Sequence, residues 1–464
     1  MRTHIIYQQQ EKFWYFMRKS NPFLTGTLIL TLAGFISRFI GFFYRAFLSR
    51  SFGEEGMGIY QLLAPVMALS FSLTAAGIQT AISKFTASET TTHDHRASLR
   101  VLFAGLLLSM PLSFFCTWLV YHYADYIAVH FLLEERTGPL LRIFALSIPF
   151  CSAHSLINGY FYGIKRAGIP ALTQILEQLA RVGSVYLLCS HLQSHGQTPR
   201  IGCAVIGLTI GECFSMLVSL TAVYLRFFRL RSLTIRRPPS GSRTTVLSMT
   251  GKIFTLSTPL TASRIAVNIL QSIEAISIPS CLVKHGFSQT QALSVYGVLT
   301  GMALPLIMFP TALINSACVL LLPVISEADE SGNRRAIQNA VRKAVTYCAG
   351  FGSLCTVCFL LLGRYAGLLL FQSEMAGSFI LTLSFICPLL YLSGALSSVL
   401  HGLGKTGITF FFNITALTAR LFFVFWLIPA IGIQGYLYGL LFSQFLITVF
   451  EILAVRYHVG RKRE

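Results

Sequence analysis

Residues 163–171 read GIKRAGIPA, and residues 402–410, which follow 239 positions later, read GLGKTGITF. At the same separation Arg181 matches Arg420. Matches that lie this close together at one separation indicate an internal repeat. Long apolar segments flank both copies, so the repeat predicts a chain of two related halves, each built from several helices.

The composition places this chain in lipid. Of its 464 residues, 54% are hydrophobic and only 11% are charged, and the mean hydropathy is +0.66. Soluble domains carry about 25% charged residues, so this chain has too few polar side chains to cover a surface in water. Its net charge of +19 would suggest nucleic acid as the partner of a soluble protein. In a membrane protein it indicates basic cytoplasmic loops, and no nucleic-acid partner is expected.

Twelve apolar runs are long enough to cross a bilayer. They lie near residues 22–47, 57–83, 99–124, 139–164, 170–190, 201–226, 253–279, 293–323, 343–363, 377–402, 407–429 and 433–455. If the N-terminus lies inside, 25 of the 36 Lys and Arg residues fall in inner segments and only six fall in outer ones. Basic residues are retained on the cytoplasmic side, so the count predicts a multi-pass cell-membrane protein with both termini in the cytoplasm.

The predicted fold class is therefore an all-α polytopic membrane protein with about twelve transmembrane helices. Each half is predicted to contain six helices. Because an even number of crossings returns the chain to the side where it started, the two halves share one topology. They are predicted to form two parallel-repeat six-helix lobes around a central cavity. The predicted parts are a cytoplasmic or interfacial leader (1–20), an N-lobe (21–228), a basic cytoplasmic linker (229–251), a C-lobe (252–456) and a basic cytoplasmic tail (457–464).

Charges inside the predicted spans are the first candidates for a functional site. Five arginines fall there: Arg38, Arg45, Arg181, Arg264 and Arg420. The clearly embedded acids are three: Glu177, Glu212 and Glu274. A charge at the bilayer centre normally faces a bundle interior or a water-filled cavity. The surplus of guanidinium groups suits an anionic ligand, because Arg binds phosphate through bidentate, charge-assisted hydrogen bonds.

Helical spacing groups some of these charges with polar neighbours. Arg264, Asn268 and Gln271 follow the spacing i, i+4, i+7, and Glu274 lies at the edge of the same helix face. Together with Arg38 and Arg45, the first three of these residues form the predicted substrate-binding set. Glu274 and Glu177 are candidates for coupling transport to protons or sodium ions.

The fifth helix of each predicted lobe carries a matching polar stripe, Gln174 with Arg181 and Asn413 with Arg420. These four residues are predicted to be structural or to line a cavity. The alternative is that each arginine neutralises an acid inside the bundle: Arg181 with Glu177 or Glu212, and Arg264 with Glu274. Pairing is favoured for Arg181 and Arg420, whereas the cavity is favoured for Arg38 and Arg264.

Other motifs carry no chemistry. Most of the eleven cysteines lie in apolar runs and are expected to be buried thiols. Cys355 and Cys358 have the spacing of a redox or zinc pair, but no second pair or nearby His completes a site. The sequence Gly404-Lys405-Thr406 lacks the earlier glycine and the strand of a phosphate-binding loop. We therefore expect no metal, no cofactor and no enzymatic activity.

Three stretches resemble one known family. They are ISRFIGF at residues 36–42, GIYQL at 58–62 and LTGMALP at 299–305. They resemble the stage V sporulation protein B and polysaccharide-exporter branch of the multidrug/oligosaccharidyl-lipid/polysaccharide (MOP) flippase superfamily. The resemblance implies transport by alternating access between two six-helix lobes, and it implies kinship with lipid II flippases.

In those flippases, arginines of helices 1, 2 and 8 line an anion site. Arg38 matches the first-helix position. The second helix of this chain has no arginine, and Thr300 stands at the position of the eighth. These relatives usually have fourteen helices, whereas about twelve are predicted here. The additional pair would border a groove for the lipid tail, so the resemblance does not supply a route for that tail.

The resulting hypothesis is a flippase or exporter of a polyprenyl-pyrophosphate-linked glycan or a similar anionic amphiphile, acting in envelope or spore assembly. Its expected partners are that substrate, membrane lipids and a coupling proton or sodium ion. The alternatives are a cation-coupled multidrug exporter of the same fold and a membrane scaffold that does not transport.

Overall fold

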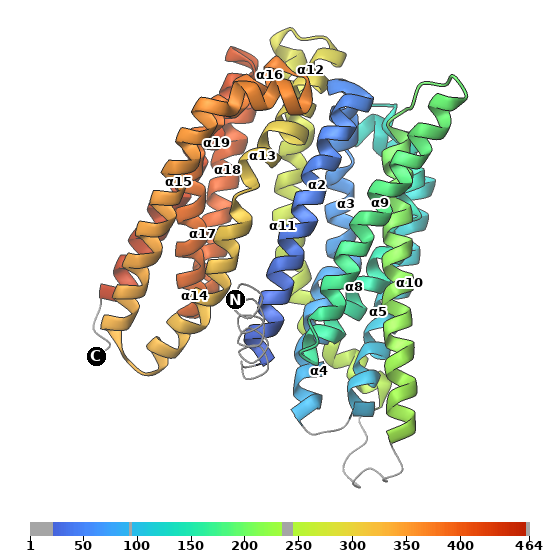
Figure 1. Cartoon of the computed structure of the whole chain (residues 1–464), viewed down its shortest axis with the longest axis vertical. Coiled ribbons are helices and arrows are strands. Elements are labelled where there is room, and N and C mark those ends of the chain that lie inside the picture. Colours follow the sequence, from blue (N-terminus) through green and yellow to red (C-terminus); the bar gives the residue numbers. More distant parts are fainter. Residues whose placement is uncertain (1–21, 92–94, 234–244, 461–464) are drawn as a thin grey trace, which may run out of the picture.

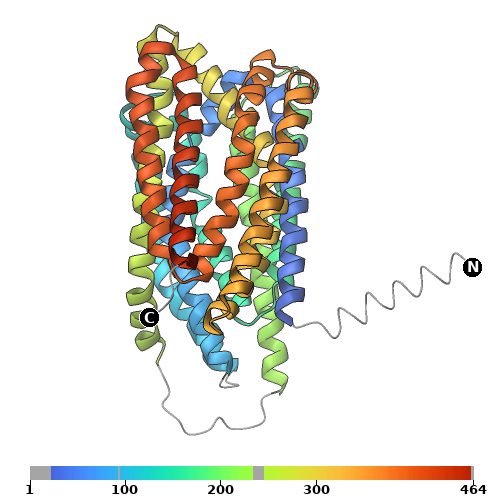
Figure 2. The same cartoon turned by 90° about the vertical axis from the view of Figure 1, so that its left-hand side faces the viewer.

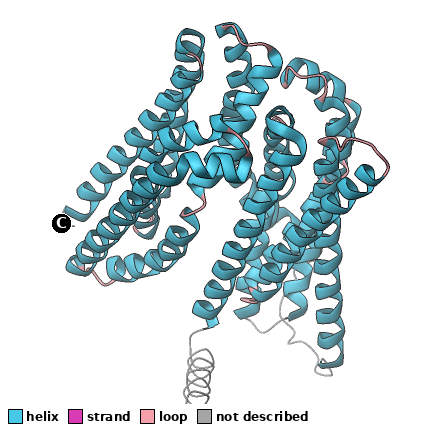
Figure 3. Ribbon diagram, turned by 45° about the horizontal axis from the view of Figure 1, so that its top comes forward, coloured by secondary structure: helices cyan, strands magenta, loops and turns pink. Residues whose placement is uncertain are grey.

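The computed structural model describes residues 22–91, 95–233 and 245–460, and within these ranges the chain is helical, with short turns and no strand (Figure 3). This confirms the all-α prediction. The predicted leader, the central part of the predicted linker and the last four residues of the predicted tail lie outside the described residues.

The first half of the chain contains nine α-helices and two short π-helical segments in its described part. They are α2 (Pro22–Gln61), α3 (Ala64–Phe71), η1 (Ser72–Ala76), α4 (Gly77–Thr91), α5 (His95–His122), α6 (Ala124–Tyr126), η2 (Ile127–Phe131), α7 (Thr137–Ala145), α8 (Ile148–Gly163), α9 (Gly168–Ser194) and α10 (Gly202–Leu233).

The described part of the second half starts with a long helix and also contains a π-helical segment. Its elements are α11 (Val246–His285), α12 (Gln289–Gly297), η3 (Val298–Ala303), α13 (Leu304–Met308), α14 (Thr311–Glu330), α15 (Arg334–Phe371), α16 (Glu374–Leu383), η4 (Ser384–Ile386), α17 (Cys387–Gly402), α18 (Thr406–Ile431) and α19 (Ile433–Gly460).

Within the described residues, ten segments are long and apolar enough to cross a membrane, and the pair α7 and α8, bent by 45°, makes an eleventh. The other predicted span is α9, which has 27 residues and carries Glu177 and Arg181. It lies among the spanning helices of its lobe (Figure 1). The chain is therefore a multi-pass membrane protein.

The internal repeat is visible in the backbone. The bounds of α8 and α17 differ by the same 239 positions that separate the two sequence motifs. Pro149 and Pro388 occupy the first turn of these two helices, where a missing N–H costs no hydrogen bond. In the turns that follow, Lys165 (φ 58°) and Gly404 (φ 73°) both adopt the left-handed conformation. The duplication thus extends to the turn geometry.

The helices form two groups that diverge toward the lower end of Figure 1, where α2 begins and α19 ends. In that view α14 to α19 lie on the left, α3 to α10 lie on the right, and α2 and α11 run between them. The view turned by 90° in Figure 2 shows the same helices running roughly along the long axis. Two six-helix lobes of this kind were predicted from the repeat.

Helix α11 packs against both groups of helices. Its Met249 and Ile253 lie in an apolar cluster with Ile78 and Leu156 of the first half. Its later part packs against α18 of the second half. The lobe bounds inferred from sequence stay a prediction, since α11 contacts both halves along its length.

At the upper end, α2 packs against α12 at very short range. A Cβ on Gly58 would lie 2.0 Å from the carbonyl oxygen of Leu293, and a Cβ on Gly297 would lie 2.3 Å from the backbone nitrogen of Gly58. Small residues permit such close backbone approach between membrane helices. The glycines therefore bring the two halves together at this end.

Candidate functional site

Polar contacts reinforce the junction at the upper end. Ser49 donates to the carbonyl oxygen of Phe371 at 3.1 Å, and Arg50 donates through Nε to that of Leu370 at 3.1 Å. Ser373 donates to the carboxylate of Glu54. These bonds tie α2 of the first half to the end of α15 and the start of α16, so the structure is joined at its upper end.

The loop before α7 adds a third connection. Arg136 NH1 lies 2.7 Å from Glu55 Oε1, and Arg136 Nε lies 2.5 Å from Glu134 Oε1. Gln289, in the first turn of α12, donates to Glu134 Oε2 at 3.4 Å. Burial by itself would raise the pKa of Glu134, but the hydrogen bonds and charge of Arg136, with the bond from Gln289, lower that pKa below its ordinary value.

Arg38 and Arg264 occupy comparable places on the two central helices. Arg38 lies 16 residues after the start of α2, and Arg264 lies 18 residues after the start of α11; both helices have 40 residues. At 1.5 Å per residue, these positions are about 24 and 27 Å from the lower helix ends. Both side chains are exposed. Among the described residues, neither guanidinium group has a carboxylate within 4.0 Å.

The other members of the predicted substrate-binding set have different surroundings. Arg45 is half-buried, and its charge interacts with Arg181 and Tyr60, so it is associated with the interior of the first lobe. Asn268 Nδ2 donates to Ser72 Oγ at 2.5 Å and therefore joins α11 to η1.

The first lobe encloses a cluster of charges. Arg181 NH2 lies 2.5 Å from Glu177 Oε1 and 3.3 Å from Glu212 Oε1. The other oxygen of Glu212, Oε2, lies 2.8 Å from His154 Nε2. Helices α8, α9 and α10 thus converge on one buried network. The predicted pairing of Arg181 with Glu177 and Glu212 is confirmed. Gln174, one turn before Glu177, is exposed.

The second lobe has an ion pair of different composition. Arg420 Nε lies 2.6 Å from Glu274 Oε1, and Arg420 NH2 donates to Oε2 at 2.7 Å. Tyr436 donates its hydroxyl to Oε1 at 2.7 Å. The alternative in which Glu274 neutralises Arg264 is not found, because Glu274 pairs with Arg420 instead. Residue Ala416 stands four positions before Arg420, where Arg181 has Glu177, so Arg420 takes its acid from α11. Asn413 is exposed and donates to the Thr409 carbonyl.

Two features were missed from the sequence. Glu451 is fully buried in α19 and accepts a hydrogen bond from Ser397, so the count of three embedded acids was wrong. Cys151 and His154 lie beside Glu212. Their i, i+3 spacing, which puts both on one helix face, is a signal that the sequence contained.

Two cavities lie in the second lobe. One, of about 290 Å³, is lined by polar groups that include Gln271, Glu274, Thr300, Arg420 and Gln444. The other, of about 550 Å³, is a groove between α14 and α15. The side chains along this groove are apolar except at Lys343, and they include Leu313, Ala344, Tyr347 and Phe351. Leu313 and Tyr347 are exposed, so the groove opens on the outer surface of the lobe.

Sequence comparisons agree with this architecture. A family model described as "Polysaccharide biosynthesis protein" matches residues 23–329. Stage V sporulation protein B of Bacillus subtilis (strain 168) is 28% identical over 437 residues, which are 93% of this chain and 83% of that protein. Lipid II flippase MurJ of the same organism is 22% identical over 342 residues, covering 70% of this chain and 62% of that protein.

Solved structures show the fold. An inward-facing multidrug resistance MATE family transporter of the MOP superfamily superposes with a TM-score of 0.70 at 16% identity, over 95% of this chain and 98% of that one. A MOP superfamily transporter from Pyrococcus furiosus, described as having a binding pocket of reverse polarity, superposes with a TM-score of 0.66 at 16% identity, over 96% of this chain and 97% of that one.

Proposed function

The chain belongs to the polysaccharide biosynthesis protein family, and from this premise we propose that it moves a polyprenyl-pyrophosphate-linked glycan across the cell membrane. Its fold is that of MOP superfamily transporters, and its sequence relatives include a protein named as a lipid II flippase. The proposal adds the substrate class, the side chains that bind it and the orientation, with both termini in the cytoplasm as the basic loops predict.

One observation carries the proposal. Arg181 and Arg420 are neutralised by glutamates, whereas Arg38 and Arg264 have no carboxylate partner among the described residues. A guanidinium group near the middle of a membrane helix is costly unless water or an anion surrounds it. The two free arginines lie on the two central helices at similar heights. An anionic group between these helices would supply the missing negative charge.

Pyrophosphate fits two such groups. Each guanidinium can form parallel hydrogen bonds to phosphate oxygens. A hydrogen bond to a charged group contributes about 1.5–3 kcal/mol, so loss of one arginine corresponds to roughly 10-fold to 150-fold weaker binding. The glycan has hydroxyl groups for polar side chains such as Gln271, which lines the polar cavity of the second lobe.

The groove between α14 and α15 is the proposed place for the polyprenyl tail. An isoprenoid chain is apolar and unbranched apart from methyl groups, and a narrow apolar groove that opens to lipid can take it without enclosing it. Lys343 is the charged residue of the groove wall and can attract a phosphate as the lipid enters. The tail would then stay in an apolar environment while the head group crosses.

Alternating access supplies the movement. The structure is joined at its upper end by Gly58, Gly297 and the bonds of Ser49 and Arg50. In the proposed orientation this end is the outer one, and the two lobes would separate on the cytoplasmic side. Glu177 and Glu274 stay the proposed coupling residues for protons or sodium ions. Each is held by an arginine, so a coupling cation must compete with that guanidinium group.

The test uses proteoliposomes that contain a fluorescent polyprenyl-pyrophosphate glycan. Arg38→Ala and Arg264→Ala should each reduce flipping at least 10-fold, and Arg38→Lys should restore part of it. Arg364→Ala is the matched control, because it changes an exposed arginine that lies on a different helix, α15. It should leave flipping unchanged. Equal flipping by Arg38→Ala, Arg264→Ala and the unchanged protein, at equal protein levels, rejects the proposed anion site.

A further inference from the structure

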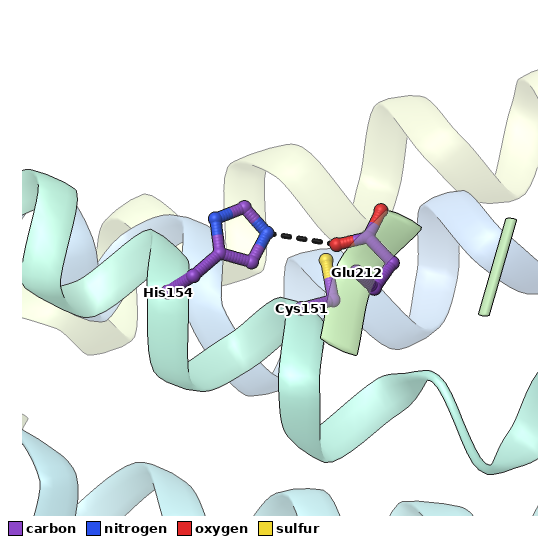
Figure 4. Close-up of side chains that lie close together, drawn as sticks. All are labelled: Cys151, His154 and Glu212. Atoms are coloured by element: carbon purple, nitrogen blue, oxygen red, sulfur yellow. Dashed lines mark hydrogen bonds and ion pairs between the residues drawn. The ribbon is translucent and has the colours of Figure 1, made fainter. Parts of the chain in front are cut away.

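Three side chains with metal-binding atoms converge inside the first lobe. Cys151 and His154 come from adjacent turns of α8, and Glu212 comes from α10 (Figure 4). The thiol sulfur, the imidazole nitrogen and the carboxylate oxygen all lie within 4.8 Å of one another. We propose that Cys151, His154 and Glu212 form a binding site for a divalent transition-metal ion of the Zn²⁺ class.

The set of donor atoms selects this class of ion. A thiolate, an imidazole and a carboxylate are the ligands of Zn²⁺ and of its spectroscopic substitute Co²⁺, whereas Mg²⁺ and Ca²⁺ prefer oxygen alone. With bonds of about 2.0–2.3 Å, tetrahedral ligands lie about 3.3–3.6 Å apart. His154 Nε2 and Glu212 Oε2 are 2.8 Å apart, so they need to separate by about half an ångström. Water would complete the coordination.

Two of the three proposed ligands are already oriented by neighbouring side chains, Glu212 by Arg181 and His154 by Asn158. Glu212 binds Arg181 through Oε1 at 3.3 Å, which leaves Oε2 directed toward His154. The other imidazole nitrogen, Nδ1, lies 3.5 Å from the side-chain amide of Asn158, whose Oδ1 is buried without a hydrogen-bond partner. Turning that amide by 180° lets Nδ1–H donate to Oδ1. Nε2 then has a free lone pair for the metal, an orientation typical of metal-bound histidines.

The charges of the surrounding groups are compatible with a divalent ion. The carboxylates of Glu177 and Glu212 share one directly contacting cation, Arg181. With His154 bound as a neutral imidazole, the two positive charges of a divalent ion and the negative charge of the Cys151 thiolate bring the net charge of these groups to zero.

The second lobe supplies an internal comparison. At the separation of 239 positions, the residues equivalent to Cys151 and His154 are Leu390 and Ser393 of α17. The helix itself is repeated with the same bounds, yet neither of its equivalents offers a strong metal ligand. The proposed site therefore belongs to the first lobe alone and does not follow from the duplicated fold.

The experiment titrates Co²⁺ and then Zn²⁺ into the full-length protein in detergent, with the affinity tag removed. Co²⁺ should produce a thiolate-to-metal charge-transfer band and the visible bands of a four-coordinate ion, at one equivalent per chain. Binding should release the proton of the Cys151 thiol, and the release is detected by an indicator in weakly buffered solution. Zn²⁺ should displace Co²⁺ and abolish both spectra.

Cys151→Ser is the deciding variant, because Cys151 takes no part in the ion pairs of Arg181. It should remove the charge-transfer band and weaken Co²⁺ binding at least 10-fold. Cys213→Ser, a change next to Glu212 at a thiol outside the triad, is the matched control and should retain both. The proposal is overturned if no charge-transfer band forms, or if Cys151→Ser keeps the band. His154→Gln should also weaken binding, and normal binding by that variant contradicts the assigned ligand set.

Discussion

The ion pair between Arg420 and Glu274 gives the sharpest test of the charge assignments. Glu274 is buried, with only 5% of its surface exposed, and its cationic partner within the described residues is Arg420. Arg420→Met removes that partner and leaves the carboxylate with the hydroxyl of Tyr436 alone. Leaving one charge of a buried pair uncompensated costs about 3–5 kcal/mol. We expect Arg420→Met to lower the free energy of unfolding by about this amount.

The assay is a double-mutant cycle. The thermal unfolding of Arg420→Met, Glu274→Gln and the combined variant would be compared in one detergent. The combined variant leaves neither charge uncompensated, so its loss should be smaller than the sum of the two single losses by about 2–3 kcal/mol. Strictly additive losses, or two single variants as stable as the unchanged protein, refute the ion pair.

Arg38 provides the contrast within the same protein. Its side chain is exposed, and no carboxylate of the described residues lies within 4.0 Å. Surface substitutions away from special contacts usually change stability by less than about 0.5 kcal/mol. Arg38→Ala should therefore unfold at nearly the same temperature as the unchanged protein while flipping is lost. A loss of stability as large as that of Arg420→Met would show that Arg38 is structural.

Three further predictions concern other parts of the molecule. Gly297→Ala places a Cβ 2.3 Å from the backbone of α2 and should cost about 1–3 kcal/mol in thermal unfolding; Gly34→Ala, which meets no atom within 4 Å, should cost nothing comparable. Arg136 lowers the pKa of Glu134, so this carboxylate stabilises the folded protein above a pH of about 4.5 and loses that effect on acidification; Glu134→Gln should flatten the pH dependence of the unfolding temperature, and an unchanged profile contradicts the assignment. Ala344→Trp fills the apolar groove and should slow flipping of long-chain more than short-chain polyprenyl substrates, whereas equal effects on both would exclude the groove as the tail site.

Much of the architecture could be predicted from the sequence because lipid imposes it. Spanning segments in lipid must satisfy their own backbone hydrogen bonds, so apolar runs of sufficient length become helices. The repeat around residues 163–171 and 402–410 located two helices whose bounds agree at one separation. The pairing of Arg181 with Glu177 could also be predicted, since residues four apart on a helix lie on one face.

Contacts between different helices could not be predicted from the sequence in the same way. Arg264 and Glu274 are close in sequence, yet Glu274 binds Arg420 of α18. Cys151 and His154 are separated from Glu212 by 58 residues or more, and only the packing of α8 against α10 brings them together. Helical periodicity fixes which residues share a face, but it does not specify which helix that face meets.

For this chain, then, the sequence alone determined a polytopic helical protein with a duplicated plan and an excess of embedded arginines, because hydropathy, periodicity and charge act locally along the chain. The tertiary structure decided which of those arginines are neutralised and which have no carboxylate partner among the described residues. That choice depends on distances of a few ångströms between separate helices, because the energy of a charge in lipid is governed by its nearest partner.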